Sequence, residues 1–153
     1  LADLQRGGGM CYAEKLLISK QDQLSPMHTH VIKAEDIINR GGATLVVELF
    51  GSKTNGEFAN DTGGVVFCDG IRREFAPGEK LRLAPGESVT LLPGDWHAFW
   101  GEGGDVLIGE VSTVNDDNTD NVFREEIGRF SQIEEDEPPR HLLVCDYKKW
   151  LRY

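Results

Sequence analysis

His28, His30 and Glu35 lie within eight positions of one another, in a short stretch that begins at Pro26. If this stretch is extended, both imidazoles point to the same side, because strand side chains repeat every second residue. Two imidazoles and a nearby carboxylate are suitable ligands for a divalent metal ion. A third imidazole would complete the set, and His97 is the candidate. We therefore predict a metal site formed by His28, His30, Glu35 and His97.

The elements that must position these ligands are short apolar runs separated by turn-forming residues. The chain has 18 glycines and six prolines, and most of them fall between such runs. Asp69-Gly70 is a strong signal for a two-residue hairpin turn. The segment 101–104 is expected to be another turn, since three of its four residues are glycine. The expected strands cover residues 12–18, 44–50, 65–68, 71–75, 80–83, 88–92, 97–100, 106–111 and 141–147.

Residues 34–40 allow two interpretations, one helical turn or a bent strand, and Gly41-Gly42 ends either of them. Strands at near-regular spacing with such separators predict an all-β protein, an antiparallel sandwich or barrel. Such a fold brings distant strands side by side. The 67 positions between His30 and His97 therefore do not argue against a shared site.

Length and charge restrict the class of protein. A chain of 153 residues is most simply one domain, covering residues 1–153. The net charge of −10 argues against binding to nucleic acid or to an anionic membrane, and no apolar run approaches the roughly 18 residues of a membrane span. The three cysteines are odd in number and widely spaced, so we expect free thiols and a cytoplasmic protein.

Two motifs resemble those of the cupin superfamily. The first cupin motif is matched from its histidines onward by His28-x-His30, four residues, Glu35, six residues and Gly42. The second is matched by Gly86, five residues, Leu92-Pro93-Gly94, two residues and His97, with the proline displaced by one position. The resemblance implies a double-stranded β-helix, or jelly-roll barrel, with little helix and with those four side chains as metal ligands.

A closer resemblance is to the D-lyxose isomerase family, which are sugar isomerases of the cupin class. It extends over about residues 1–147, and its longest matching segments are 28–42, 109–121 and 129–138. Family members carry more chain before the point that matches Leu1, so we expect this chain to lack that N-terminal part. The resemblance implies interconversion of D-lyxose and D-xylulose, with D-mannose and D-fructose as a second pair, and a homodimer.

Aldose–ketose isomerisation moves one proton between C1 and C2 and another between the two oxygens. A divalent ion bound by both oxygens would polarise the carbonyl group. Mn²⁺ is the expected ion, and Zn²⁺, Co²⁺ or Fe²⁺ also suits the ligand set. The same ligands leave two other functions open, an Fe²⁺ dioxygenase and a non-catalytic sugar-binding cupin.

Several further residues are candidates for acid–base chemistry or for sugar binding. Glu110 ends the apolar run 106–110, where a carboxylate costs free energy unless it is paired, functional or turned outward. Lys33 lies between two ligands and could bind a sugar oxygen or move a proton. Aromatic residues around His97 could wall a pocket. The predicted catalytic residues are Lys33, Glu110, Asp117 and Asp120, and the predicted substrate-binding residues are Lys33, Trp96 and Arg129.

Overall fold

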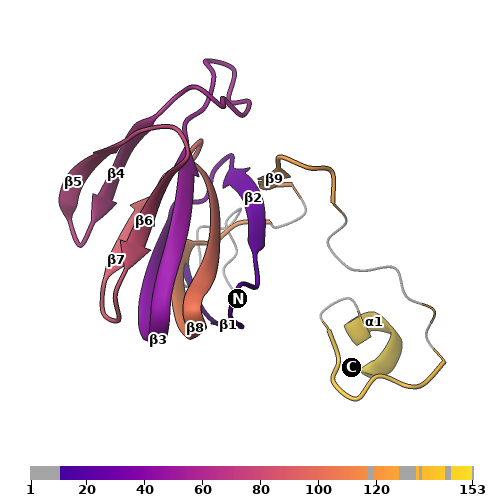
Figure 1. The fold of residues 1–153 in the computed structure, drawn as a ribbon. Helices are drawn as coiled ribbons and strands as arrows, with labels where there is room; N and C mark the ends of the chain where they lie inside the picture. Colours follow the sequence, from indigo (N-terminus) through magenta and orange to yellow (C-terminus); the bar gives the residue numbers. More distant parts are fainter. Residues whose placement is uncertain (1–10, 117–118, 128–133, 135, 144–145, 153) are drawn as a thin grey trace.

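The protein folds into an antiparallel β-structure with one short helix in the described residues, as the computed structural model shows (Figure 1). The structure describes residues 11–116, 119–127, 134, 136–143 and 146–152. In the described residues, all pairs between the named strands are antiparallel, as predicted. The elements are β1 (Tyr12–Ser19), β2 (Ser25–His30), β3 (Glu35–Phe50), β4 (Gly64–Cys68), β5 (Ile71–Phe75), β6 (Glu79–Leu83), β7 (Ser88–Leu91), β8 (Trp96–Thr113), β9 (Asn121–Phe123) and α1 (Tyr147–Trp150).

The two long strands β3 and β8 pair along most of their lengths and connect the rest of the sheet. The first half of β3 also pairs with β7, and its second half pairs with β6. Similarly, the first half of β8 pairs with β2 and its second half with β1. In Figure 1 the β4–β5 hairpin lies on one side of this central pair, and β2 and β9 lie on the other. The halves of β3 and β8 therefore belong to different parts of the curved sheet.

The long strands bend at glycines. Gly42 has a φ of +99°, and a Cβ atom there would clash with the carbonyl oxygen of Asp105 on β8. The pairing register of β3 and β8 also shifts around Gly41 and Gly42. A bent strand is therefore the correct one of the two interpretations that residues 34–40 allow, and it begins at Glu35. The expectation that Gly41-Gly42 ends it is wrong, because β3 continues through both glycines.

The prediction of a turn at residues 101–104 is wrong. The expected strands 97–100 and 106–111 are parts of the single strand β8. Gly103 and Gly104 have φ values of +81° and +154°, so they bend the strand without ending its pairing with β3. Local composition cannot distinguish a bend from a turn, because glycine favours both.

Asn39 holds the bend in place from inside the protein. This side chain is fully buried, and its Nδ2 group donates hydrogen bonds of 2.9 Å to the carbonyl oxygens of Ala43 and Leu83. Its Oδ1 atom accepts a hydrogen bond from the backbone N–H of Gly41. A buried amide with these partners ties the bend to β6, since Leu83 is the last residue of that strand.

The predicted hairpin at Asp69-Gly70 is confirmed. These residues connect β4 and β5, and their φ values are +50° and +79°. Positive φ at both central positions is the requirement of the type I′ turn, whose twist matches that of the flanking strands.

Apolar side chains fill the interior between the two parts of the sheet. Along β3 and β8, alternate residues point inward and join this core. Glu35, His97 and Glu110 lie at inward positions of the same two strands, so the polar site continues the rows that build the core. The core consists of Ile37, Leu45, Val47, Leu49, Val66, Phe75, Leu81, Leu83, Val89, Leu91, Phe99, Val106 and Ile108.

The prediction of a final strand over residues 141–147 is wrong within the described residues. Residues 141–143 form no strand, and Tyr147 begins α1. The carboxylate of Asp146 accepts a hydrogen bond from the backbone N–H of Leu143, and the N–H of Asp146 donates to the carbonyl of Leu143. Both bonds are local contacts between Leu143 and Asp146.

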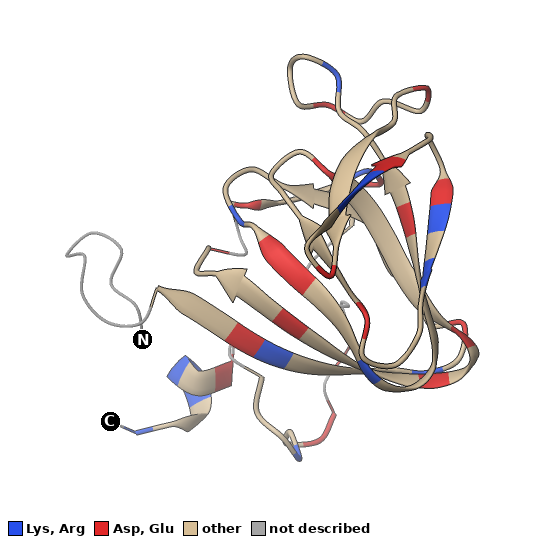
Figure 2. Cartoon of the chain, turned by 90° about the vertical axis from the view of Figure 1, so that its left-hand side faces the viewer, with Lys and Arg blue, Asp and Glu red and all other residues tan. Residues whose placement is uncertain are grey.

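Charged residues are mixed over the surface. Lysines and arginines lie among aspartates and glutamates on the strands and loops (Figure 2), and pairs such as Lys20–Asp105 and Arg82–Glu102 form across them. The expectation that the protein does not bind nucleic acid stays a prediction. Among the described residues, no helix has the length and apolar character needed to cross a membrane.

Candidate metal centre

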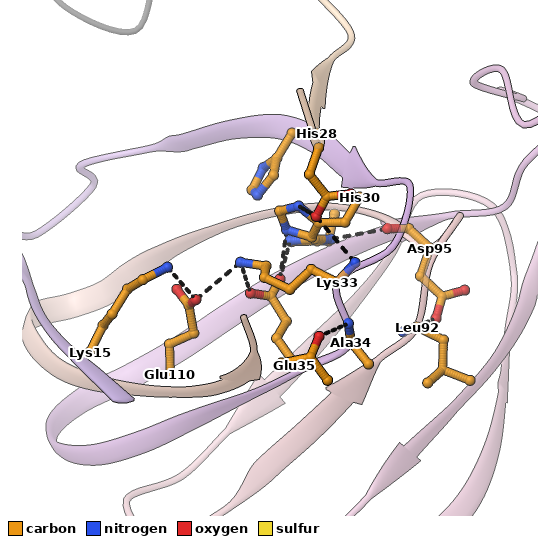
Figure 3. Close-up of polar contacts among 12 residues, drawn as sticks. Lys15, His28, His30, Lys33, Ala34, Glu35, Leu92, Asp95 and Glu110 are labelled. Carbon is orange, nitrogen blue, oxygen red and sulfur yellow. Dashed lines mark hydrogen bonds and ion pairs between the residues drawn. The ribbon is translucent and has the colours of Figure 1, made fainter. Parts of the chain in front are cut away.

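The four predicted ligands meet in one cluster. Figure 3 shows three of them, His28, His30 and Glu35. The candidate ligand atoms of His28, His30, Glu35 and His97 all lie within 4.8 Å of one another. Ligands bound to one ion at about 2.1 Å lie roughly 3 to 4.2 Å apart, so a slight contraction would bring these four onto a common ion. His30, Glu35 and His97 are buried and His28 is partly buried. The geometry fits a site for a divalent ion.

Strand register brings His28 to His97. These residues are direct partners in the pairing of β2 with β8, and their ring centroids lie 4.2 Å apart. His30 is two residues further along β2, so it points to the same face. The His-x-His spacing and one strand pair therefore place all three imidazoles together.

Glu35 reaches the cluster only because β3 bends. In the sheet, His97 pairs with Leu49, which is 14 residues after Glu35. A straight strand would separate positions 35 and 49 by roughly 46 Å. Glu35 Oε1 nevertheless lies 3.1 Å from His97 Nε2 and 3.1 Å from His30 Nε2. The bend at Gly41 and Gly42 folds the first half of β3 back across the interior.

Backbone carbonyls orient two of the imidazoles. Nδ1 of His28 lies 2.7 Å from the carbonyl oxygen of Pro26, and Nδ1 of His97 lies 3.0 Å from that of Asp95. A carbonyl oxygen only accepts hydrogen bonds, so each Nδ1 must carry the proton. In the neutral rings, Nε2 is then a bare lone pair directed at the cluster, as in metal-ligating histidines.

The cluster needs a cation for electrostatic balance. His97 Nε2 is buried without a hydrogen-bond partner and faces a Glu35 oxygen 3.1 Å away. A lone pair facing a carboxylate oxygen at this distance is repulsive unless a positive charge lies between them. This orphaned nitrogen supports the interpretation of the cluster as a metal site.

The environment favours the protonation states that metal ligands require. Burial, with a smaller effect of the neighbouring His97, lowers the pKa of His28 to about 3, so this imidazole is neutral at pH 7. Burial alone would raise the pKa of Glu35. Polar and charged contacts, among them the Lys33 ammonium 2.6 Å away, outweigh burial and hold that pKa well below its usual range, so the carboxylate is ionised.

A chain of alternating charges connects the cluster to the surface (Figure 3). Lys33 Nζ lies 2.6 Å from Glu35 Oε2 and 3.0 Å from Glu110 Oε1. Lys15 Nζ donates to the same Glu110 oxygen over 2.8 Å, and its side chain is 42% exposed. Burial alone would lower the pKa of Lys33, but Glu35 and Glu110 raise it above its ordinary value, so the ammonium stays charged.

Glu110 therefore points inward and is paired, which excludes the outward-facing alternative. Lys15 was not among the predicted site residues. It is the direct partner of Glu110 in the pairing of β1 with β8. The sequence carried a weak signal for it, because Lys15 shares a strand face with the apolar Ala13 and Leu17.

Asp120 contacts the segment that follows His30. Its carboxylate accepts hydrogen bonds from the backbone N–H groups of Val31, Ile32 and Lys33. One of its oxygens also lies 4.0 Å from His30 Nδ1. Asp120 thus contacts the segment between two metal ligands, and it is 3% exposed.

Trp96 is not in the cluster. It precedes His97 on β8 and so points to the opposite face of the strand. Its ring meets Phe58 edge to face at 5.4 Å and lines a cavity of about 600 Å³, which His30 also lines. The other predicted residues, Asp117 and Arg129, lie outside the described residues.

Comparison with known proteins gives the family. A family model described as D-lyxose isomerase matches residues 1–147. The chain belongs to the D-lyxose isomerase family. This confirms the resemblance inferred from the motifs.

Two curated relatives of the chain are named D-lyxose/D-mannose isomerase. The protein from Serratia proteamaculans is 53% identical over 142 residues, and that from Escherichia coli O157:H7 is 48% identical over 142 residues. Each match covers 92% of this chain and 62% of the relative. The chain therefore spans about three-fifths of the length of these relatives.

Solved structures with a similar fold are sugar-modifying proteins of low sequence identity. Ligand-free L-ribose isomerase of Cellulomonas parahominis has a TM-score of 0.56 at 20% identity. The match covers 75% of the present chain and 58% of the L-ribose isomerase chain. A dTDP sugar isomerase from Desulfovibrio desulfuricans G20 has a TM-score of 0.54 at 9% identity. This match covers 78% of the present chain and 69% of the Desulfovibrio chain. These likenesses concern the fold, and they confirm the predicted cupin architecture.

Proposed function

We propose that the protein is a metal-dependent aldose–ketose isomerase that interconverts D-lyxose and D-xylulose, and D-mannose and D-fructose as a second pair. Family membership and the names of the two relatives support this assignment. The observation that carries it is the position of a buried lysine–carboxylate chain directly beside the histidine cluster. This arrangement combines groups that could hold a metal ion with groups that could move protons.

The ion would be held by His28, His30, Glu35 and His97. We propose Mn²⁺ as this ion. Zn²⁺, Co²⁺ or Fe²⁺ also suits three imidazoles and a carboxylate. When bound, the ion would act as a Lewis acid that polarises the sugar carbonyl and offsets developing negative charge. The isomerase would work in the cytoplasm, the compartment expected from the odd number and wide spacing of the cysteines.

Glu110 is the proposed base for the carbon-bound proton. Within the described residues, both lysines bond to its Oε1 atom. Its Oε2 atom is therefore the oxygen that would take the proton from C2 and return it to C1. The contacts with Lys15 and Lys33 orient the carboxylate and limit its rotation.

Lys33 is the proposed donor to the sugar oxygens. Its ammonium lies between Glu35 and Glu110, and the raised pKa keeps it protonated at neutral pH. A sugar oxygen near Nζ could accept its hydrogen bond while the proton moves between O1 and O2. Asp117 as a further acid–base group and Arg129 as a donor to sugar hydroxyls stay predictions from the resemblance.

A homodimer is also part of the proposal. One exposed face of β1 and β8 carries large apolar side chains, among them Tyr12, Leu16, Ile18 and Leu107. Contiguous exposed apolar side chains of this kind mark interaction surfaces. Light scattering coupled to gel filtration should give twice the mass of one chain.

The test of the activity is direct. The purified chain would be stripped with a chelator, reloaded with Mn²⁺ and incubated with D-lyxose, and D-xylulose would be quantified by chromatography. We expect product from the loaded protein and none from the stripped protein or from His97→Ala. A folded, loaded protein that forms no ketose would refute the proposal. Sugar binding without turnover would then indicate a non-catalytic cupin, and oxygen uptake with a catechol would indicate a dioxygenase.

A further inference from the structure

We propose that Asp120 is a positioning residue that holds the connection between β2 and β3 and the ring of His30 in the geometry for metal binding. The proposal rests on the proposed metal site. It assigns Asp120 a role different from the acid–base role predicted from the sequence.

The first observation is a set of three consecutive amides that converge on one buried carboxylate. Val31 and Ile32 donate to Asp120 Oδ1 over 3.0 Å and 2.6 Å, and Lys33 donates to Oδ2 over 3.1 Å. The backbone carbonyl of Asp120 also accepts from the N–H of Val31. Successive N–H groups that surround an anion form a strong, charge-assisted contact.

The second observation is the lack of apolar anchoring in the segment that these bonds hold. The side chains of Val31 and Ile32 are 61% and 73% exposed, so they contribute little packing. The segment nevertheless lies between the ligands His30 and Glu35 and carries the buried Lys33. The bonds to Asp120 are therefore polar restraints on the segment that joins those two ligands.

The third observation concerns the His30 ring. Its Nε2 atom faces Glu35, while its Nδ1 atom is buried without a hydrogen-bond partner, 4.0 Å from Asp120 Oδ2. In His28 and His97 the corresponding Nδ1 atoms face backbone carbonyl oxygens. All three histidines thus have an oxygen on the Nδ1 side. The Asp120 carboxylate would attract the Nδ1 proton of His30 and direct its Nε2 lone pair to the ion.

The same contacts argue against proton transfer by Asp120. Both of its carboxylate oxygens accept backbone amides, and the residue is 3% exposed. It is also outside the chain of contacts that joins Lys33, Glu110 and Lys15.

The test uses Asp120→Asn and measures two properties that do not depend on turnover. The first is the Kd for Mn²⁺, from competition with a chelator. The second is amide hydrogen exchange of residues 31–33 in the metal-free protein. We expect metal binding to weaken by about 10- to 100-fold and these three amides to exchange faster, since loss of an outer-shell partner of a ligating histidine typically has effects of this size.

Asp105→Asn is the matched control. Its carboxylate also accepts hydrogen bonds from the backbone N–H of Gln21 and from the ammonium group of Lys20. Asp105 lies on the surface, away from the cluster. The control should leave both the Mn²⁺ Kd and the exchange of residues 31–33 unchanged.

Two results would overturn the proposal. One is an Asp120→Asn variant with unchanged Kd and unchanged exchange. The other needs no variant: solvent-like exchange of residues 31–33 in the metal-free wild-type protein would show that Asp120 does not hold them. A wild-type protein that binds Mn²⁺ but does not isomerise sugars would refute the proposed activity and leave these readouts intact.

Discussion

Lys33 and Lys15 offer a test of how much the buried charge chain contributes to stability. Both ammonium groups donate to the same oxygen of Glu110, over 3.0 Å and 2.8 Å. They differ in surroundings, because the side chain of Lys33 is 4% exposed and that of Lys15 is 42% exposed. We compare Lys33→Met with Lys15→Met, since methionine keeps most of the apolar stem and removes the charge.

The expected losses follow from burial. Lys33→Met leaves two carboxylates, Glu35 and Glu110, buried beside each other with their shared cation removed. Breaking a buried ion pair in this way costs about 3 to 5 kcal/mol of unfolding free energy. Lys15→Met removes a partly solvated ion and leaves Glu110 paired with Lys33, so its cost is about 0 to 1 kcal/mol.

The assay is urea unfolding of the metal-free proteins at pH 7, followed by circular dichroism, so that metal binding adds no stability of its own. The pKa of Lys33 is raised in the folded state above its ordinary 10.5. A group with a raised folded pKa contributes stability that is fully present below its unfolded value and is lost only as pH rises through the folded one. The contribution of Lys33 is therefore complete at pH 7. Equal losses of unfolding free energy in the two variants would show that the length of the hydrogen bond to Glu110, and not the burial of the lysine, determines its contribution to stability.

Two further predictions concern the proposed base and the bend. Glu110→Gln should keep Mn²⁺ bound and lower kcat by about 10²- to 10⁴-fold, the usual contribution of a general base; full activity with normal metal content would place the base elsewhere. Gly42→Ala should destabilise the protein by about 1 to 3 kcal/mol more than Gly86→Ala. Their φ values are +99° and +98°, but only the Cβ at 42 would meet a backbone atom, the carbonyl oxygen of Asp105, so equal melting temperatures would contradict the steric argument.

Short-range patterns in the sequence predicted much of the fold. The hairpin at Asp69-Gly70 depends on two adjacent residues that tolerate positive φ, which is a local property. The all-β class follows from short apolar runs between turn formers. The missed continuity of β8 at residues 101–104 has the opposite cause, because β8 pairs with the neighbouring strand β3 on both sides of Gly103 and Gly104.

The candidate site was also predicted only in part from the sequence. The His-x-His spacing was sufficient to place His28 and His30 on one face, and their chemistry, with that of Glu35 and His97, predicted a metal site. The roles of other residues depended on which way their side chains point in the folded protein. Whether Glu110 points inward is decided by the register of β8, and the same register turns Trp96 away.

The sequence by itself determined which atoms could bind a metal ion, because ligand type and the two-residue repeat of a strand are local properties. Only the tertiary structure decided that Glu35 meets His97. The two lie on strands whose direct pairing would keep them far apart, and the bend at Gly41 and Gly42 closes that distance. Tertiary contacts also recruited Lys15 and turned Asp120 toward the backbone of residues 31–33. The physical reason is that burial and contact across the barrel depend on how strands curve and pair, which single residues do not encode.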